Sequence, residues 1–230
     1  AASSNTNGTI TSSVSANAAA GFSIASFTCP SGSGSYTVGH GLGAVPEFMI
    51  VKGRSATGNW HIYHIDVGNA KAYFLNNSTA GFTSSYWGNT TPTSTVFTQT
   101  IGGTLDSGTT AIGYFFNSVD GYSLVGSYVG NGSTDGVYVH CGFSPALIIT
   151  KSTAGTGWRM IDNRRTPFNP STASLYPDSN DAEYTGSGHE TDFTSNGFKM
   201  RNSNSRLNTS GQTYIFLAFA ESPFKHTNAR

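Results

Sequence analysis

Charged residues are scarce in this sequence. They make up 10% of its 230 residues, and 12 basic side chains balance 12 acidic ones. Nucleic acids and anionic membranes attract basic surfaces, so this balance argues against both as partners. Cysteine is almost absent too. Cys29 and Cys141 allow at most one disulfide and exclude a four-thiolate zinc site, and we expect two free, semi-buried thiols.

Long apolar runs are also missing. No stretch approaches the roughly 20 apolar residues of a membrane-spanning helix, and no basic segment followed by an apolar core opens the chain. We therefore expect no membrane insertion. Because the sequence starts at Ala1 and not at methionine, we expect a processed or excised product.

What the chain does contain is typical of a polar, turn-rich β protein. It has 28 glycines, 13% aromatic residues and abundant serine, threonine and asparagine. A disordered chain would lack the aromatic and β-branched residues.

The two halves of the chain resemble each other. Five blocks recur in the same order with slips of a few residues: 21–24 (GFSI) with 121–124 (GYSL), 46–52 with 145–151, 60–63 (WHIY) with 158–161 (WRMI), 105–108 with 207–211, and 110–116 with 213–219. Collinear blocks of this kind indicate a tandem repeat. His40 and His140 also fall at nearly equivalent places.

The repeat predicts the domain organisation. We expect a first β repeat at residues 21–119, a second at 120–224, and a C-terminal tail at 225–230. Residues 1–20 carry few large apolar side chains, so we expect a linker or an assembly arm that orders on a partner.

Each copy has short β-branched and aromatic runs between glycine, asparagine, serine and proline, which predicts about six or seven strands per copy. No segment shows a sustained helical period. We therefore predict an all-β fold of two tandem β-sandwich-like repeats with pseudo-symmetry and minor helix content. Trp60 and Trp158, in matched strands, are expected in the cores.

The residue patterns do not favour catalysis or metal binding. His61 and His64 point to opposite faces of a strand, so they cannot chelate one ion together. The one carboxylate cluster lies in the stretch from Arg164 to Asn196, and the first copy has no counterpart. We expect no enzyme, no catalytic residue, no metal and no cofactor.

Aromatic side chains beside polar ones on loops are a pattern that holds sugars, through ring stacking and hydrogen bonds. An alternative, which we favour, is that these aromatics close the ends of the sandwiches as core plugs. The candidate glycan-binding residues are Trp87, Tyr86, Tyr176, Tyr184, Asp178 and Asp181.

Several segments resemble a module of unknown function that recurs in virion proteins of marine tailed phages, often described as tail-fibre-like. The segments that carry the resemblance are 21–24, the run 37–43 (TVGHGLG) into Pro46 and 50–52 (IVK), 121–123 with 130–133 (GNGS), 195–199 (SNGFK), and 218–224 (AFAESPF).

The resemblance implies a structural virion protein: a fibre, tail or capsid-surface decoration subunit at the virion surface or outside the cell. Its expected partners are further copies of itself and other virion proteins, with host surface glycans as further candidates. The alternatives are a carbohydrate-binding adhesion module and a subunit of a non-phage extracellular filament. Because few charges protect the strand edges, we expect assembly through an edge strand or the N-terminal arm.

Overall fold

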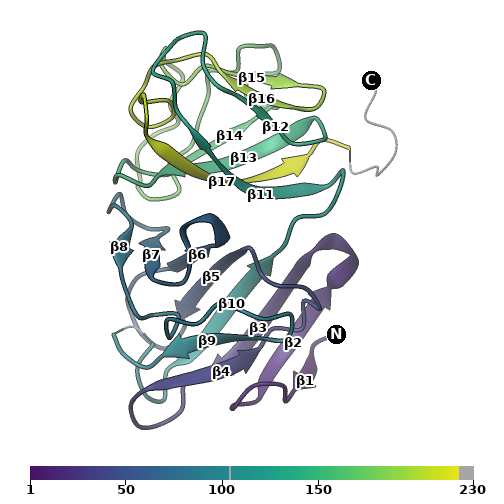
Figure 1. Ribbon diagram of the computed structural model, residues 1–230, viewed down its shortest axis with the longest axis vertical. Helices are drawn as coiled ribbons and strands as arrows, with labels where there is room; N and C mark the ends of the chain where they lie inside the picture. The colour runs from purple at the N-terminus through teal and green to yellow at the C-terminus, as the bar shows by residue number, and fades with distance from the viewer. Residues whose placement is uncertain (104, 223–230) are drawn as a thin grey trace. The chain divides into compact units, whose positions relative to one another are not determined.

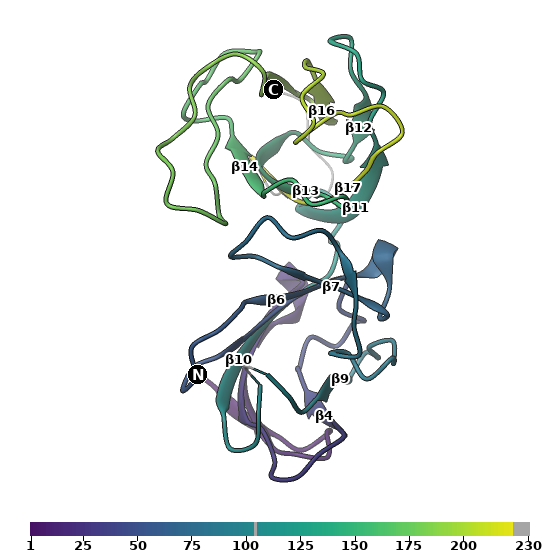
Figure 2. The same cartoon turned by 90° about the vertical axis from the view of Figure 1, so that its left-hand side faces the viewer.

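The computed structural model describes residues 1–103 and 105–222, which fold into two compact units. The first contains Ala1–Leu75 and Gly81–Asn117, and the second contains Asn76–Ala80 and the chain from Ser118 onward. Figures 1 and 2 show layered strands in each unit. Residues 223 and 224 of the predicted second repeat, and the predicted tail at 225–230, lie outside the described residues.

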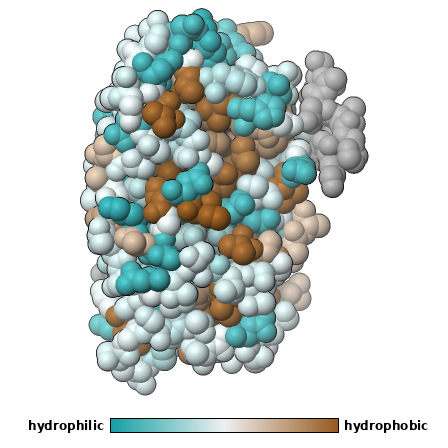
Figure 3. Space-filling view, in the orientation of Figure 1, coloured by the Kyte–Doolittle hydropathy of each residue, from teal (hydrophilic) through white to brown (hydrophobic). Residues whose placement is uncertain are grey.

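The prediction of an all-β fold is confirmed. The strands pair antiparallel, and the described ranges contain no α-helix, only the short 3-10 turns η1 (Ala18–Ala20) and η2 (Ile65–Val67). No helix of these ranges is long and apolar enough to cross a membrane. On the face shown in Figure 3, neutral and hydrophilic residues surround smaller hydrophobic patches.

The first unit is a sandwich of a large and a small sheet. The large sheet has the order β1-β2-β3-β10-β5-β6-β7-β8, and the small one pairs β4 with β9. The strands are β1 (Ser3–Asn5), β2 (Ser12–Asn17), β3 (Phe22–Thr28), β4 (Ser35–Gly39), β5 (Phe48–Gly53), β6 (His61–His64), β7 (Lys71–Phe74), β8 (Phe82–Thr83), β9 (Val96–Thr100) and β10 (Thr110–Phe116).

The core of this unit lies between its two sheets. Alternation in β3 buries every second residue, so that Ala25 and Phe27 enter the core while their neighbours face outward. The opposite sheet contributes Val38 from β4 and Phe97 from β9, and the Phe27 and Phe97 rings lie 5.9 Å apart. Cys29 belongs to this core and is a free thiol, as is the buried Cys141 in the second unit.

The N-terminal residues differ from the linker or arm that the sequence predicted. β1 and β2 extend the large sheet, with Ser13 opposite Ser26 and Asn17 opposite Phe22. Val14 is 5% exposed and belongs to the core. Composition did not predict strands here, because the side chains of this segment are small and bury little apolar surface. Backbone hydrogen bonds to the edge of β3 hold the segment in the sheet instead.

The second unit repeats the arrangement with a shorter main sheet. That sheet has the order β11-β17-β13-β14, and the facing sheet has the order β12-β16-β15. The strands are β11 (Ser123–Val129), β12 (Tyr138–His140), β13 (Pro145–Ser152), β14 (Arg159–Asp162), β15 (Thr191–Thr194), β16 (Gly197–Met200) and β17 (Thr213–Ala220).

The strand order supports the predicted repeat. The order β11-β17-β13-β14 matches β3-β10-β5-β6, and the pair β12-β16 matches β4-β9. Trp158 is fully buried, whereas its counterpart Trp60 is only partly buried. Asn76–Ala80, within the predicted first repeat, belongs to the second unit, where the Lys151 amino group donates a 3.3 Å hydrogen bond to the Asn77 carbonyl.

The pairing of the strands corrects two of the predicted matches between the repeats, each by one residue. Phe27 pairs with Ala111 and Tyr128 with Tyr214, so Tyr128 takes the place of Phe27. The block 21–24 is therefore one residue out of step with 121–124. In the facing sheets Val38 pairs with Phe97 and Val139 with Phe198.

The same shift corrects the proposed match of two histidines. Because Val139 takes the place of Val38, Cys141 and not His140 occupies the position of His40. His40 is fully buried, and its ring lies 5.4 Å from that of Phe115, whereas His140 is exposed.

The role of β2 in the first unit is testable. We expect Val14→Ala to lower the free energy of unfolding of this unit by about 2 kcal/mol, because it removes two methyl groups from a packed core. The measurement is urea denaturation of the full chain. Val129→Ala, at a side chain that is 55% exposed, is the control and should change stability by less than about 0.5 kcal/mol. Equal effects of the two variants would contradict the assignment of Val14 to the core.

Candidate ligand-binding site

Three of the predicted glycan-binding residues meet in the second unit. Tyr176, Asp178 and Asp181 line one hollow of about 330 Å³. The other lining residues, all in the second unit, are Asn76, Asn77, Ser78, Gly157, Arg159, Ser179 and Arg206. This hollow is the candidate site because charged, amide and aromatic side chains converge on it.

Tyr184, a fourth candidate, does not line this hollow. Its ring packs against His189 with 4.0 Å between the centroids, and its hydroxyl donates to the Ser187 carbonyl. Tyr184 therefore supports the loop next to the site.

Trp87 is a core residue of the first unit, so its assignment to glycan binding is corrected. Its side chain is fully buried, and its indole nitrogen donates a 3.1 Å hydrogen bond to the Lys71 carbonyl. A buried ring of this kind cannot stack on a sugar. Trp87 is the core plug that we favoured as the alternative interpretation.

Tyr86 belongs to the first unit too, whereas the candidate site belongs to the second. It lines a hollow of about 380 Å³ together with Phe82, and its ring packs at a tilt against that of His61, with 4.2 Å between the centroids. Tyr86 and Trp87 are therefore members of a different unit from the other candidates.

The strand pairing at β14 places an arginine over an aromatic ring. Met160 and Leu175 exchange backbone hydrogen bonds of 3.0 and 2.9 Å, which brings the neighbouring residues Arg159 and Tyr176 side by side. The Arg159 guanidinium carbon lies 4.2 Å from the centre of the Tyr176 ring. This is the geometry of a cation–π contact.

Arg159 is unusual because it is both charged and buried. It is 1% exposed, and its guanidinium donates to the Trp158 carbonyl, yet its Nε has no hydrogen-bond partner in the described structure. Burial, and then the nearby Arg206, lower its pKa to about 10, so it stays charged at neutral pH. An unsatisfied buried donor costs about 1–3 kcal/mol.

Asp178 supplies an unsatisfied acceptor at the same site. Its Oδ1 is buried without a hydrogen-bond partner in the described structure. Its Oδ2 lies against the backbone of Gly157, at the place where a larger residue would carry its β-carbon. A β-carbon added to Gly157 would be 2.3 Å from this oxygen. Glycine at position 157 therefore makes room for the carboxylate.

Lys151 extends this set of buried polar groups. Its amino group donates to the carbonyls of Asn77 and Thr156, and it lies 5.5 Å from the centre of the Trp158 ring. Burial is the main cause that lowers its pKa to about 8. Lys52 in the first unit similarly donates to the carbonyls of Gly53 and Ala56, which indicates that these lysines brace the following loop.

His189 lies behind the loop that carries Tyr176. It is 1% exposed, and its Nδ1 lies 2.8 Å from the Ser174 hydroxyl oxygen. Burial, followed by the charges of Arg159 and Arg206, lowers the pKa of His189 to about 4. The ring is therefore neutral at pH 7.

Sequence reasoning missed Arg159, Arg206, Lys151 and His189. A signal for Arg159 was present, because WRMI in the second copy replaces WHIY in the first and so puts arginine where the first copy has His61. The structure gives both residues a similar setting: the His61 ring packs at a tilt against the Tyr86 ring, and the Arg159 guanidinium lies over the Tyr176 ring.

The site suits a small, hydroxyl-rich ligand. Its arginines and asparagine amides can donate to hydroxyl oxygens, and its carboxylates can accept from hydroxyl groups. Within the described residues, no group of three or more His, Cys, Asp or Glu side chains could hold a metal ion.

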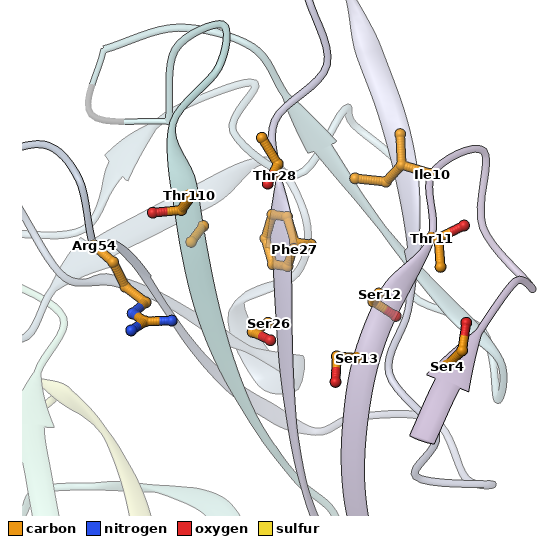
Figure 4. A pocket seen from close by; sticks show the side chains of 11 residues that line it. Ser4, Ile10, Thr11, Ser12, Ser13, Ser26, Phe27, Thr28, Arg54 and Thr110 are labelled. Carbon is orange, nitrogen blue, oxygen red and sulfur yellow. The ribbon is translucent and has the colours of Figure 1, made fainter. Parts of the chain in front are cut away.

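A second hollow, of about 590 Å³, lies in the first unit over β2, β3 and β10 (Figure 4). Hydroxyl side chains dominate its lining, with Ile10, Phe27 and Ala111 as apolar members and Arg54 as the one charged residue. It lacks the buried charged groups of the candidate site.

A family model described as a domain of unknown function (DUF7483) matches residues 1–223. The chain belongs to this family. No curated protein and no solved structure matches it. The DUF7483 match covers residues 1–20 together with both sandwiches, in keeping with the place of β1 and β2 inside the first unit.

The buried histidine predicts an acid-sensitive second unit. The unfolded chain protonates His189 near its ordinary pKa of 6.5, whereas the folded chain does so only near 4. Stability contributed by the neutral ring is therefore complete above pH 6.5 and falls as the pH drops towards 4, by up to about 3 kcal/mol.

We expect His189→Gln to flatten this dependence, measured as urea-unfolding free energies between pH 4 and 7. The exposed His140→Gln is the control and should keep the dependence of the parent chain. An unchanged slope in His189→Gln would show that the histidine is not held neutral.

Proposed function

We propose that the chain is a non-catalytic structural protein of a tailed-phage virion, acting as a fibre, tail or capsid-surface decoration subunit. Its proposed location is the virion surface, and its proposed partners are further copies of itself and other virion proteins. The resemblance of the segments between residues 21 and 224 to tail-fibre-like modules supports this proposal.

One structural observation carries the proposal furthest: within the described residues β11 is an edge strand, and its last residues, 127–129, lie beyond the contacts that Ser118 and Val119 make with its first half. Val129 on this strand is 55% exposed, and Ser127 is exposed. Exposed edges without charged side chains tend to pair with other chains. An assembling protein uses such an edge, whereas a monomer would normally protect it.

Assembly and particle association test this proposal. We expect light scattering of the purified chain to show a concentration-dependent oligomer, and antibodies against it to label native virions. A strictly monomeric chain with no particle-associated form would contradict the proposal. Labelled filaments without virions would instead support the alternative of an extracellular filament subunit.

We further propose that the second unit binds glycans at the host surface. The observation that favours this role is the convergence of Tyr176, Asp178 and Asp181 with Arg206 on one hollow of the second unit. A volume of about 330 Å³ is near the lower end for ligand pockets and suits one or two sugar rings.

Glycan binding through this site predicts a selective loss in variants. We expect the parent chain to bind a subset of host-surface glycans on an array. Asp178→Asn should weaken binding by about 10- to 100-fold, because it removes a charge-assisted hydrogen bond. Tyr86→Ala, in the first unit, is the matched control and should bind like the parent. Failure to bind any host glycan, or equal losses in both variants, would remove this role.

A further inference from the structure

The hollow of the second unit has a cation on its wall that no neighbouring carboxylate neutralises. Arg206 is exposed and lines the hollow together with Tyr176 and Asp181. Its backbone amide donates a 2.9 Å hydrogen bond to the Asn204 side chain. Its guanidinium makes no hydrogen bond and no ion pair in the part of the chain that the structure describes. The charge of Arg206 is therefore available to a ligand.

The other exposed arginines of the described second unit are paired. Arg164, Arg165 and Arg201 each form at least one ion pair with a carboxylate of the same unit. Arg206 is the exception, although the hollow that it lines contains two aspartates. An arginine that faces a polar hollow without an ion pair is a group that an anionic ligand can use.

A second arginine lies close enough to repel Arg206. Arg159 lines the same hollow, with its guanidinium over the ring of Tyr176. Burial, and then the charge of Arg206, lower the pKa of Arg159. Burial, followed by the charges of both arginines, lowers the pKa of His189 behind the loop. An anion bound beside the two arginines would offset their mutual repulsion.

The aspartates of the hollow do not cancel this positive charge. Burial lowers the pKa of Lys151, and the charge of Asp178 opposes that shift, so Asp178 already acts on this lysine. Asp181 is the other acidic residue of the lining, against Arg159 and Arg206 as the basic ones. Three basic and two acidic side chains therefore surround the hollow, which leaves one positive charge in excess.

Both arginines of the site are specific to the second repeat. By strand register, His61 of the first unit occupies the place of Arg159. The residue before the block 105–108 is a threonine, whereas the residue before the matching block is Arg206. No charged side chain occurs among the described residues that line the hollow beside Tyr86 in the first unit. Duplication of the scaffold therefore does not account for the positive charge.

An acidic glycan combines the groups that this hollow can bind. A guanidinium group presents its donors as a planar fork, which matches the paired oxygens of an anionic group such as a carboxylate. The carboxylate of Asp181 can accept from hydroxyl groups. A neutral glycan would leave the charge of Arg206 unmatched, and a bare anion would make no use of Asp181.

We propose that the hollow of the second unit binds an acidic glycan, with Arg206 holding its carboxylate or sulfate group and Asp181 accepting from one of its hydroxyl groups. This inference rests on the proposed glycan-binding role and specifies the class of glycan.

A glycan array with the full chain tests the class of ligand. The probes are oligosaccharides that contain uronic acids, the same oligosaccharides after reduction of their carboxyl groups, sulfated oligosaccharides, and their desulfated forms. We expect binding of at least one acidic class and at least 10-fold weaker binding of its neutral form. The acidic class that binds identifies the anionic group.

Arginine variants test the position of that group. Arg206→Gln removes the charge and should weaken binding of the acidic glycan at least 10-fold, whereas its neutral form should bind as it does to the parent. Arg206→Lys keeps the charge without the fork and should give an intermediate affinity. Arg201→Gln is the matched control, because Arg201 is exposed on the same unit but does not line the hollow. It should bind like the parent.

Three results would overturn the inference. Equal binding of acidic and neutral forms would show that the anionic group is not recognised. Acidic binding that survives in Arg206→Gln would place the anion elsewhere. Equal losses in Arg206→Gln and Arg201→Gln would assign the binding to general surface charge. Matching thermal unfolding of the variants and the parent establishes that all of them fold.

The inference and the glycan-binding role can fail separately. Glycans that bind equally in acidic and neutral form, and whose binding Asp178→Asn weakens, would support the role and contradict the inference. The absence of binding to every glycan of the array would contradict both.

Discussion

Both sandwiches depend on one backbone arrangement, in which the last strand of a repeat pairs between its first and third strands. β10 lies between β3 and β5, and β17 between β11 and β13. Residues 214–218 of β17 are all buried, so its backbone groups depend on these two ladders. Because the strands that pair are far apart in sequence, each repeat depends on contacts between distant parts of its chain, which slow folding.

This arrangement also determines which strands become edges. The first strand of each repeat lies on the outer side of β10 or β17. β3 and β11 would therefore each be a sheet edge unless another segment pairs with them. β3 pairs with β2, with Val14 as the apolar anchor, whereas the described residues that bond to the outer side of β11 are Ser118 and Val119. The repeats thus share the same strand order and differ in what pairs with the outer side of their first strand.

The sequence predicted the features that depend on regular alternation and on large apolar side chains. The duplication and the all-β fold follow from such patterns. The strand character of residues 12–17 could not be read in the same way, because serine and alanine give little contrast between the two faces. The one-residue shift of β11 also escaped the alignment, since only the pairing of Tyr128 with Tyr214 reveals it.

The sequence predicted some residues of the candidate site and missed others. Tyr176, Asp178 and Asp181 were identifiable as an aromatic and acidic loop, but burial of Arg159 beneath Tyr176 depends on the bridge between Met160 and Leu175. Trp87 shows the converse: its polar neighbours made it a candidate for glycan binding, but the core of the first unit encloses it, as the favoured core-plug interpretation predicted. Local composition indicates a loop, and only tertiary pairing decides which of its side chains face a ligand.

The two units differ at one sheet edge: β3 of the first unit pairs with β2, whereas β11, its counterpart in the second unit, pairs with no such strand in the described residues. Amide hydrogen exchange of the isolated chain at Ser26 and Ser127, which occupy equivalent positions on β3 and β11, tests it most directly. We predict a slowly exchanging Ser26 amide, paired with β2, and a Ser127 amide that exchanges close to the rate of an unstructured peptide. Equal protection at both amides would show that β11 is covered as β3 is.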